Sequence, residues 1–165
     1  MPENVRQNGS NVLVIRSKFS INKFEDDIIP YSGDGDMVQF IKDNYHGLVG
    51  HRTQDNAADF KDPLVVVYYD VDYSKNPKGT NYWRNRILKV AQNHKDTHLA
   101  ISKSNRSYFT IEASKFGLKI PPEGDAAPVV AARSKEGLKY KMEDEFSVEN
   151  FEKSISDLPA FTRFT

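Results

Sequence analysis

The chain has 165 residues, enough for one domain with a real core or for one domain plus a piece of another, and its 28% charged and 38% apolar residues are ordinary for a globular protein. Lysine plus arginine equals aspartate plus glutamate at 23 each, so bulk charge predicts no polyanion partner and any electrostatic function needs local segregation. There is no cysteine, which excludes disulfides, thiol redox chemistry and cysteine-ligated metals in this chain.

The two ends carry no targeting signal that we can identify. The first residues, "MPENVRQNGSN", lack the apolar core of a secretory signal, and we expect a disordered start over 1–10. The final residues form no retention tetrapeptide. No stretch approaches the roughly 18 apolar residues of a membrane span, so no membrane insertion is expected.

Residues 11–47 are predicted to form a β-β-α unit. The runs 11–19 and 22–31 have the pattern of two strands that could pair as a hairpin. The acidic turn 32–36 suits a helix start, and Gly47 is a plausible stop. Between them, apolar residues fall at helical spacing: Met37, Phe40, Ile41 and Tyr45. Such a unit is too small to close a core alone.

From about residue 48 the pattern alternates between strands and helices. Strands are expected at 47–53, 63–71, 97–103, 127–134 and 137–142, and helices at 54–60, 78–93, 108–116 and 147–158. The run "PLVVVYYDV" has the continuous apolar character of a central strand buried on both faces. For the helix at 78–93 the expected apolar face is Tyr82, Ile87, Val90 and Ala91. Alternation predicts parallel strands first and an antiparallel hairpin at the end.

The predicted fold class is therefore α/β with the thioredoxin-like order β-α-β-α-β-α-β-β-α, preceded by a partial unit. We expect 11–47 to be the C-terminal remnant of one thioredoxin-like domain and 48–165 a complete second one. In that fold a proline, usually cis, opens the strand before the closing hairpin, and Pro128 stands at this point.

Several segments resemble the protein disulfide isomerases, notably the member that works on glycoproteins with calnexin and calreticulin in the endoplasmic reticulum. The segments are "INKFED", "DNYHGLVGHRTQDN", "YYDVDYSKNPKGTNYWRNR", "SKFGL" and "APVVAARSKEGLKYKMEDEFS". The resemblance implies that 48–165 is a redox-inactive b′ domain and 11–47 the end of a b domain. The family's CxxC sites lie in other domains, so isomerase activity is not implied for this chain. The ending "DLPAFTRFT" departs from the family pattern.

The stretch 73–95 separates charge most clearly. It has no acidic residue and carries six basic ones: Lys75, Lys78, Arg84, Arg86, Lys89 and Lys95. Lys78, Tyr82, Arg86 and Lys89 follow one another at helical spacing and could share a helix face. A solvated surface helix would look the same. Binding of single-stranded nucleic acid fits loosely, but the acidic flank at 70–72 would repel phosphates, so no nucleic-acid partner is expected.

The resemblance implies a partner for this stretch. In the family a basic patch on b and b′ binds the acidic tip of the calnexin and calreticulin arm domain, and its key positions match Lys23, Lys78 and Arg86. Tyr82, Trp83 and Lys89 are candidates for its rim. Arginine can form a forked contact with a carboxylate, which lysine cannot. Two alternatives stay open: a chaperone-type b′ module that binds unfolded glycoproteins, and a disulfide isomerase by virtue of a full-length parent.

Other candidate chemistry is weaker. The four histidines show no metal-ligand spacing that we favour, and "SGDGD" lacks the remaining ligands of a calcium loop. Asp70 and Asp72 alternate along a strand end, where solvated side chains are the simplest interpretation. We predict no catalytic residue, no metal and no cofactor. Glycosylation sequons occur at Asn8 and Asn105 and matter only if the chain enters the endoplasmic reticulum lumen, the location that the resemblance implies.

Overall fold

The chain divides into two compact units, Met1–Gly47 and Leu48–Thr165. The structure is a computed structural model. It describes residues 13–15, 22–26, 28–31, 33, 35–103, 107–118, 127–156 and 162–164. The two sequons at Asn8 and Asn105 and the expected disordered start lie outside the described residues.

The first unit is an antiparallel strand pair followed by one helix, the β-β-α order expected from the sequence. Strand β1 (Leu13–Ile15) pairs with β2 (Ile28–Pro30), and helix α2 (Met37–Asn44) follows. Asp36 caps α2, since its Oδ1 accepts hydrogen bonds from the backbone N–H groups of residues 38 and 39 at 2.9 and 3.4 Å. No residue of α2 is buried, so the apolar residues at helical spacing do not close a core.

The second unit contains a six-stranded mixed sheet with the order β3-β5-β4-β6-β7-β8. The strands are β3 (Val49–His51), β4 (Leu64–Tyr69), β5 (His98–Lys103), β6 (Val129–Arg133), β7 (Lys139–Lys141) and β8 (Thr162–Phe164). Strands β3, β5 and β4 run parallel, and β6, β7 and β8 add antiparallel pairs. The predicted fold class is confirmed, with a parallel first half and an antiparallel hairpin near the end.

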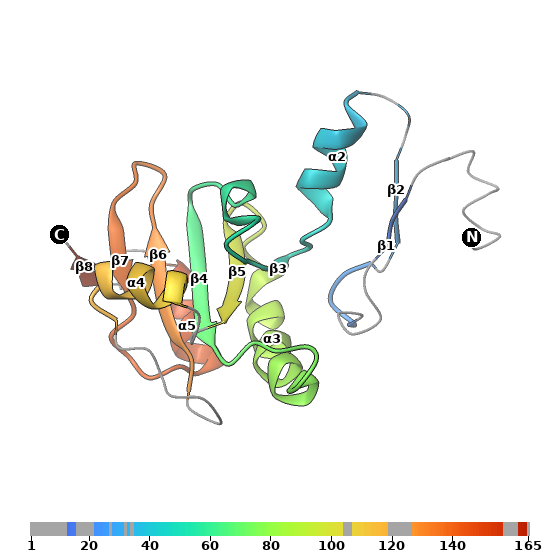
Figure 1. The fold of residues 1–165 in the computed structure, drawn as a ribbon. Helices are drawn as coiled ribbons and strands as arrows, with labels where there is room; N and C mark the ends of the chain where they lie inside the picture. Colours follow the sequence, from blue (N-terminus) through green and yellow to red (C-terminus); the bar gives the residue numbers. More distant parts are fainter. Residues whose placement is uncertain are drawn as a thin grey trace. The chain divides into compact units, whose positions relative to one another are not determined.

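Within the described residues of this unit, three α-helices cover the sheet. They are α3 (Pro77–Ala91), α4 (Ser107–Lys115) and α5 (Val148–Ser156); α3 and α5 lie on one face and α4 on the other (Figure 1). Local residues set two of the helix ends. Ser147 caps α5 by accepting a hydrogen bond from the Asn150 N–H at 3.0 Å, and Gly117 ends α4 with a positive φ of 75°.

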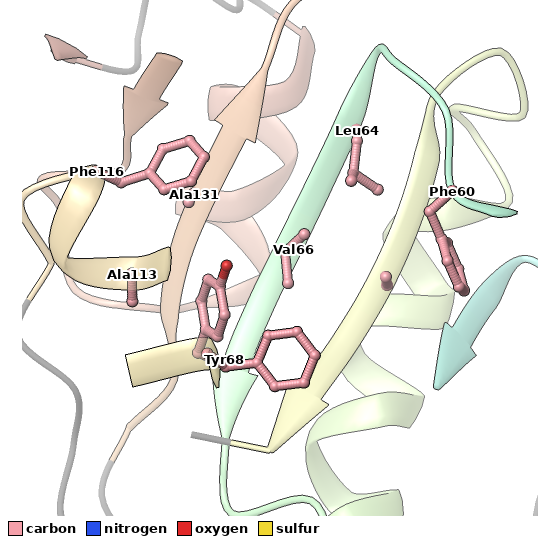
Figure 2. Packing of buried hydrophobic residues seen from close by; sticks show 9 residues of the cluster. Phe60, Leu64, Val66, Tyr68, Ala113, Phe116 and Ala131 are labelled. Carbon is pink, nitrogen blue, oxygen red and sulfur yellow. The ribbon is translucent and has the colours of Figure 1, made fainter. Parts of the chain in front are cut away.

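The core is built around β4, whose six residues are all buried. Side chains alternate across a strand, so one set faces α4 and the other faces α3 and α5. Figure 2 shows the α4 side, where Leu64, Val66 and Tyr68 meet Ala113 and Phe116. On the opposite side the Tyr69 hydroxyl donates to the backbone oxygen of Thr80 on α3 at 2.7 Å. Burial on both faces explains the continuous apolar run in the sequence.

Two elements differ from the sequence-based expectations. The helix expected at 54–60 is a turn followed by one 3-10 turn, η1 (Ala57–Asp59). The Asn56 side chain accepts from the Thr53 N–H at 2.7 Å and donates to the His51 oxygen at 3.0 Å, and such local bonds compete with an α-helix. The second difference is β8, which extends the sheet beyond β7 in the segment that departs from the family pattern.

The expectation of a cis bond before Pro128 is wrong. Among the described residues the cis peptide bond is Asp62–Pro63, which precedes β4 rather than β6. Pro128 is buried and directly precedes β6, so it occupies the expected place in the fold with the trans bond that X–Pro sequences ordinarily favour. The resemblance predicted the position of the proline correctly but not its isomer.

Candidate partner-binding surface

The loop between β4 and α3 is held by hydrogen bonds and an ion pair. Asp72 Oδ1 accepts from the N–H groups of Ser74 and Lys75 at 2.9 and 2.8 Å. Lys103 at the end of β5 donates from Nζ to Asp72 at 2.9 Å and contacts Asp70 at 3.4 Å. Asp70 and Asp72, for which the sequence favoured solvated side chains, therefore share the ammonium group of Lys103. This contact fixes the loop against the sheet.

Helix α3 begins at a well-formed cap. Asn76 accepts a hydrogen bond from the Gly79 N–H at 3.1 Å, and Pro77 occupies the first helical position, where a missing N–H is harmless. A Cβ atom on Gly79 would lie 2.4 to 2.8 Å from the Asn76 side chain, so a larger residue would displace the cap. The cap and the Asp72 turn together position the first turn of α3, which carries Lys78.

Acidification provides a test of this anchoring. The hydrogen bonds from the Lys75 backbone and the Lys103 ammonium lower the pKa of Asp72 to about 2, below its ordinary value of about 3.9. A lowered folded-state pKa means that the stabilisation is present above about pH 4 and is lost as the pH falls toward 2. In urea titrations, the stability difference between the wild type and Asp72→Asn should therefore shrink over this range. A constant wild-type advantage over Asp72→Asn across this range would contradict the anchoring.

The outer side of α3 presents what we call the basic face, formed by Lys78, Tyr82, Arg86 and Lys89. Lys78 and Lys89 are exposed, and the Tyr82 side chain is 50% exposed. The Arg86 guanidinium lies over the Tyr82 ring, with Cζ 3.5 Å from the ring centroid. Among the described residues no carboxylate pairs with Lys78, Arg86 or Lys89. The charge segregation predicted from 73–95 is therefore found at the surface.

In the stretch 73–95, Arg84 and Tyr82 differ in burial from what the sequence predicted. Arg84 is only 3% exposed, and its guanidinium donates to the Val49 backbone oxygen from Nε at 3.2 Å and Nη2 at 2.8 Å. It therefore belongs to the structural contact between α3 and β3 rather than to the basic face. Tyr82 is the reverse case, because it was expected on the apolar face. The buried positions of α3 are Thr80, Arg84, Ile87, Leu88, Val90 and Ala91.

Trp83 and Lys23 complete the predicted binding residues. Trp83 is half-buried, with its ring edge-on to Tyr82 at 4.9 Å and to Phe146 at 5.6 Å between centroids. Lys23 is exposed and belongs to the first unit, where its Nζ lies 5.3 Å from the Phe24 ring centroid. The structure thus brings Lys78, Arg86 and Lys89 onto one helix, while Lys23 is carried by a separate unit.

The other candidate groups have structural partners. His94 Nε2 lies 2.9 Å from a Glu152 carboxylate oxygen and joins the end of α3 to α5, while His98 Nδ1 accepts from the Lys61 N–H at 2.9 Å. Within the described ranges, no cluster of three or more histidines and carboxylates could hold a metal ion. No helix in the same part of the chain is long and apolar enough to cross a membrane.

A cavity that sequence reasoning did not locate opens at the carboxyl ends of β3, β4 and β5. It has a volume of about 620 Å³, and its lining includes His51, Gln54, Asp55, Tyr73, Lys103 and Phe109. The rings of His51 and Tyr73 meet edge-on at 5.7 Å. Ligands of α/β sheets commonly bind at the carboxyl ends of strands, and this rule was the one available signal for the cavity.

A cysteine-free α/β unit with this strand order defines a thioredoxin-like domain without a dithiol site, and comparisons with known proteins agree. The model of the family described as "Thioredoxin-like domain" matches residues 3–157. The chain is 40% identical over 149 residues to chicken (Gallus gallus) "Protein disulfide-isomerase A3", covering 86% of this chain and 29% of the relative. It is 35% identical over 135 residues to Schistosoma mansoni "Probable protein disulfide-isomerase ER-60", covering 78% and 27%.

A solved structure shows the same fold. The crystal structure of the bb fragment of ERp72 superposes with a TM-score of 0.75 at 25% identity, covering 91% of this chain and 68% of that one. The chain therefore belongs to the thioredoxin-like domain family, and it is similar to part of the protein disulfide isomerases named above. It spans less than a third of the length of the two curated relatives above, 29% and 27%. It contains no CxxC motif, because it contains no cysteine.

Proposed function

We propose that this chain is a non-catalytic binding module that docks the acidic arm of calnexin or calreticulin. In this role it supports oxidative folding of glycoproteins in the endoplasmic reticulum lumen, where redox-active domains of a protein disulfide isomerase perform the chemistry. The observation that carries the proposal is the basic face of α3, which offers three cations and an exposed aromatic ring without a carboxylate partner among the described residues.

The position of Lys78 supports a role beyond helix stability. Lys78 is the second residue of α3, and the first turn of that helix contains no acidic residue. The positive end of the helix dipole makes a cation there unfavourable by about 0.3–1 kcal/mol. A residue that opposes its local preference in this way is often retained for function. Lys78 and the helix end together attract an anionic group, as an acidic polypeptide tip would supply.

Arg86 supports the same partner chemistry. A guanidinium can donate two parallel hydrogen bonds to one carboxylate, and its charge cannot be lost at physiological pH. Exposed ion pairs contribute only about 0.2–1 kcal/mol each, so the basic face should bind with modest affinity, fast association and strong dependence on salt. These are suitable properties for a module that must release its partner between substrates.

The proposal is tested by titrating the chain with the isolated acidic arm domain of calreticulin and following amide shifts by NMR. Shifts should centre on α3 and fade as salt is raised from about 0.05 to about 0.5 M. Arg86→Ala should weaken binding by about fivefold, which corresponds to the upper end of an exposed ion pair. Lys95→Ala is the matched control, since Lys95 is exposed but lies beyond α3. A folded sample without shifts, or equal losses in both variants, would refute docking through this face.

A second candidate function is peptide binding of the chaperone type, which the cavity at the carboxyl ends of β3, β4 and β5 favours. Its volume of about 620 Å³ falls in the range of ligand pockets, and the buried Phe109 ring gives it an apolar wall. A reduced, carboxymethylated polypeptide should then shift residues such as Tyr73 and Phe109 and leave Lys89 unchanged. The reverse pattern would favour the basic face.

A further inference from the structure

On the basic face, the Arg86 side chain is held at two points by Tyr82. The Arg86 Cζ lies over the Tyr82 ring, 3.5 Å from its centroid, well inside the usual range for cation–π contacts. Its Nη1 also donates to the Tyr82 backbone oxygen at 2.9 Å. One residue thus holds Arg86 through both its ring and its carbonyl group, and the remaining N–H groups stay available to a ligand.

The ring that holds Arg86 is itself tied to the core. Tyr82 meets Trp83 edge-on at 4.9 Å, Trp83 meets Phe146 at 5.6 Å, and Phe146 meets the buried Phe151 at 5.2 Å. Edge-to-face and tilted arrangements at these separations are the favourable ones for aromatic pairs. The row of rings runs from the packed side of α5 to the exposed side of α3, so Arg86 rests on a supported platform.

Burial in the core does not explain why position 82 is a tyrosine. The side chain is half exposed and is not among the buried residues of α3, so its replacement leaves no cavity in the core. A simple helix-stabilising pair at i and i+4 would account for the contact but predicts no effect on binding. A helix-stabilising pair and a role in binding therefore differ in whether removal of the Tyr82 ring changes the order of the Arg86 side chain and the affinity for a ligand.

We propose that Tyr82 is a positioning residue that pre-orders Arg86 for recognition of a carboxylate. A free arginine side chain loses rotamer freedom when it binds, and an arginine already stacked on a ring loses less. The inference deepens the proposed function and rests on it for the identity of the partner, but pre-ordering of Arg86 applies to any carboxylate ligand. It also makes position 86 specific for arginine, because an ammonium group cannot both stack flat and donate a forked pair of hydrogen bonds.

The test compares Tyr82→Leu, which removes the ring, with Tyr82→Phe, which keeps it, and uses Asn93→Leu as a control for an added surface leucine. In the free protein, NMR of the Arg86 guanidinium should show slowed rotation about Cζ–Nε in the wild type and Tyr82→Phe and faster rotation in Tyr82→Leu. Affinity for pentaglutamate, read from Arg86 Nε–H shifts, should fall about two- to fivefold in Tyr82→Leu only. In an Arg86→Ala background, Tyr82→Leu should have no further effect on pentaglutamate binding followed at backbone amides.

Two results would overturn the positioning role: equal guanidinium rotation in the wild type and Tyr82→Leu, or an equal loss of affinity with and without Arg86. Failure of the proposed function gives a different pattern. If the calreticulin arm does not bind while pentaglutamate binding still depends on Tyr82, the partner is wrong and the positioning role holds.

Discussion

Replacing Glu112 with alanine is expected to lower the free energy of unfolding of the second unit by about 3–5 kcal/mol. Arg52 is only 4% exposed, and its guanidinium donates to both Glu112 carboxylate oxygens at 2.7 and 2.9 Å. The Tyr68 hydroxyl donates to the same carboxylate. Burial acts to raise the pKa of Glu112, but the hydrogen bonds from Arg52 and Tyr68 outweigh burial and keep that pKa below its usual value. The alanine variant removes the carboxylate that accepts two hydrogen bonds from the buried Arg52 guanidinium.

Urea denaturation at neutral pH measures this effect, with Glu136→Ala in an exposed turn as the control. The control should change stability by less than about 0.5 kcal/mol. The double variant Arg52→Met/Glu112→Leu removes both charges and should be more stable than Glu112→Ala, because hydrophobic replacement of a buried pair is often neutral. Equal stability of Glu112→Ala and the control would show that the pair contributes nothing.

The elements set by local sequence were predictable. The six-residue apolar run of β4, the caps at Asp36 and Ser147 and the stop at Gly117 are signals that a few neighbouring residues carry. Their alternation was enough to predict a parallel core with an antiparallel hairpin. The basic face was predictable for the same reason, because Lys78, Arg86 and Lys89 lie within one helix and obey its period.

The features that sequence missed depend on partners far along the chain. Arg84 is buried and its guanidinium binds the Val49 carbonyl, which lies 35 positions away, whereas Arg86 lies over the Tyr82 ring on the outer side of the same helix. Arg52 meets Glu112 across 60 positions, and nothing near either residue marks the pair. The helical period alone leaves the rotation of α3 uncertain by one residue, which is why Tyr82 fits both the expected apolar face and the expected basic face in the sequence.

The loop after the central strand is held by Asp72 and Lys103 and leads into a capped helix. This arrangement fixes the first turn of α3, which carries Lys78, and one and two turns later the helix presents Tyr82 and Arg86. The basic face of our proposal therefore stands on a helix whose start is fixed by local hydrogen bonds.

Truncating Phe151 to alanine should lower the free energy of unfolding by about 3–5 kcal/mol, since the side chain is fully buried and its loss leaves a cavity. Phe151 packs at 5.2 Å from Phe146, which in turn contacts Trp83 beside the basic face. The variant should therefore also weaken binding of the calreticulin arm under conditions where it is still folded. Phe151→Leu should lose less stability, and Ile111→Ala, at an exposed position, should lose little.

Thermal or urea unfolding and the NMR titration together separate the two effects. A folded Phe151→Ala protein that binds the arm as tightly as the wild type would show that the aromatic row supports the core but not Arg86. A loss of binding with faster rotation of the Arg86 guanidinium would show that the position of the basic face depends on packing between α3 and α5. We expect the second result, because Trp83 is the ring that supports Tyr82 from the core side within the described residues, and Tyr82 in turn holds Arg86.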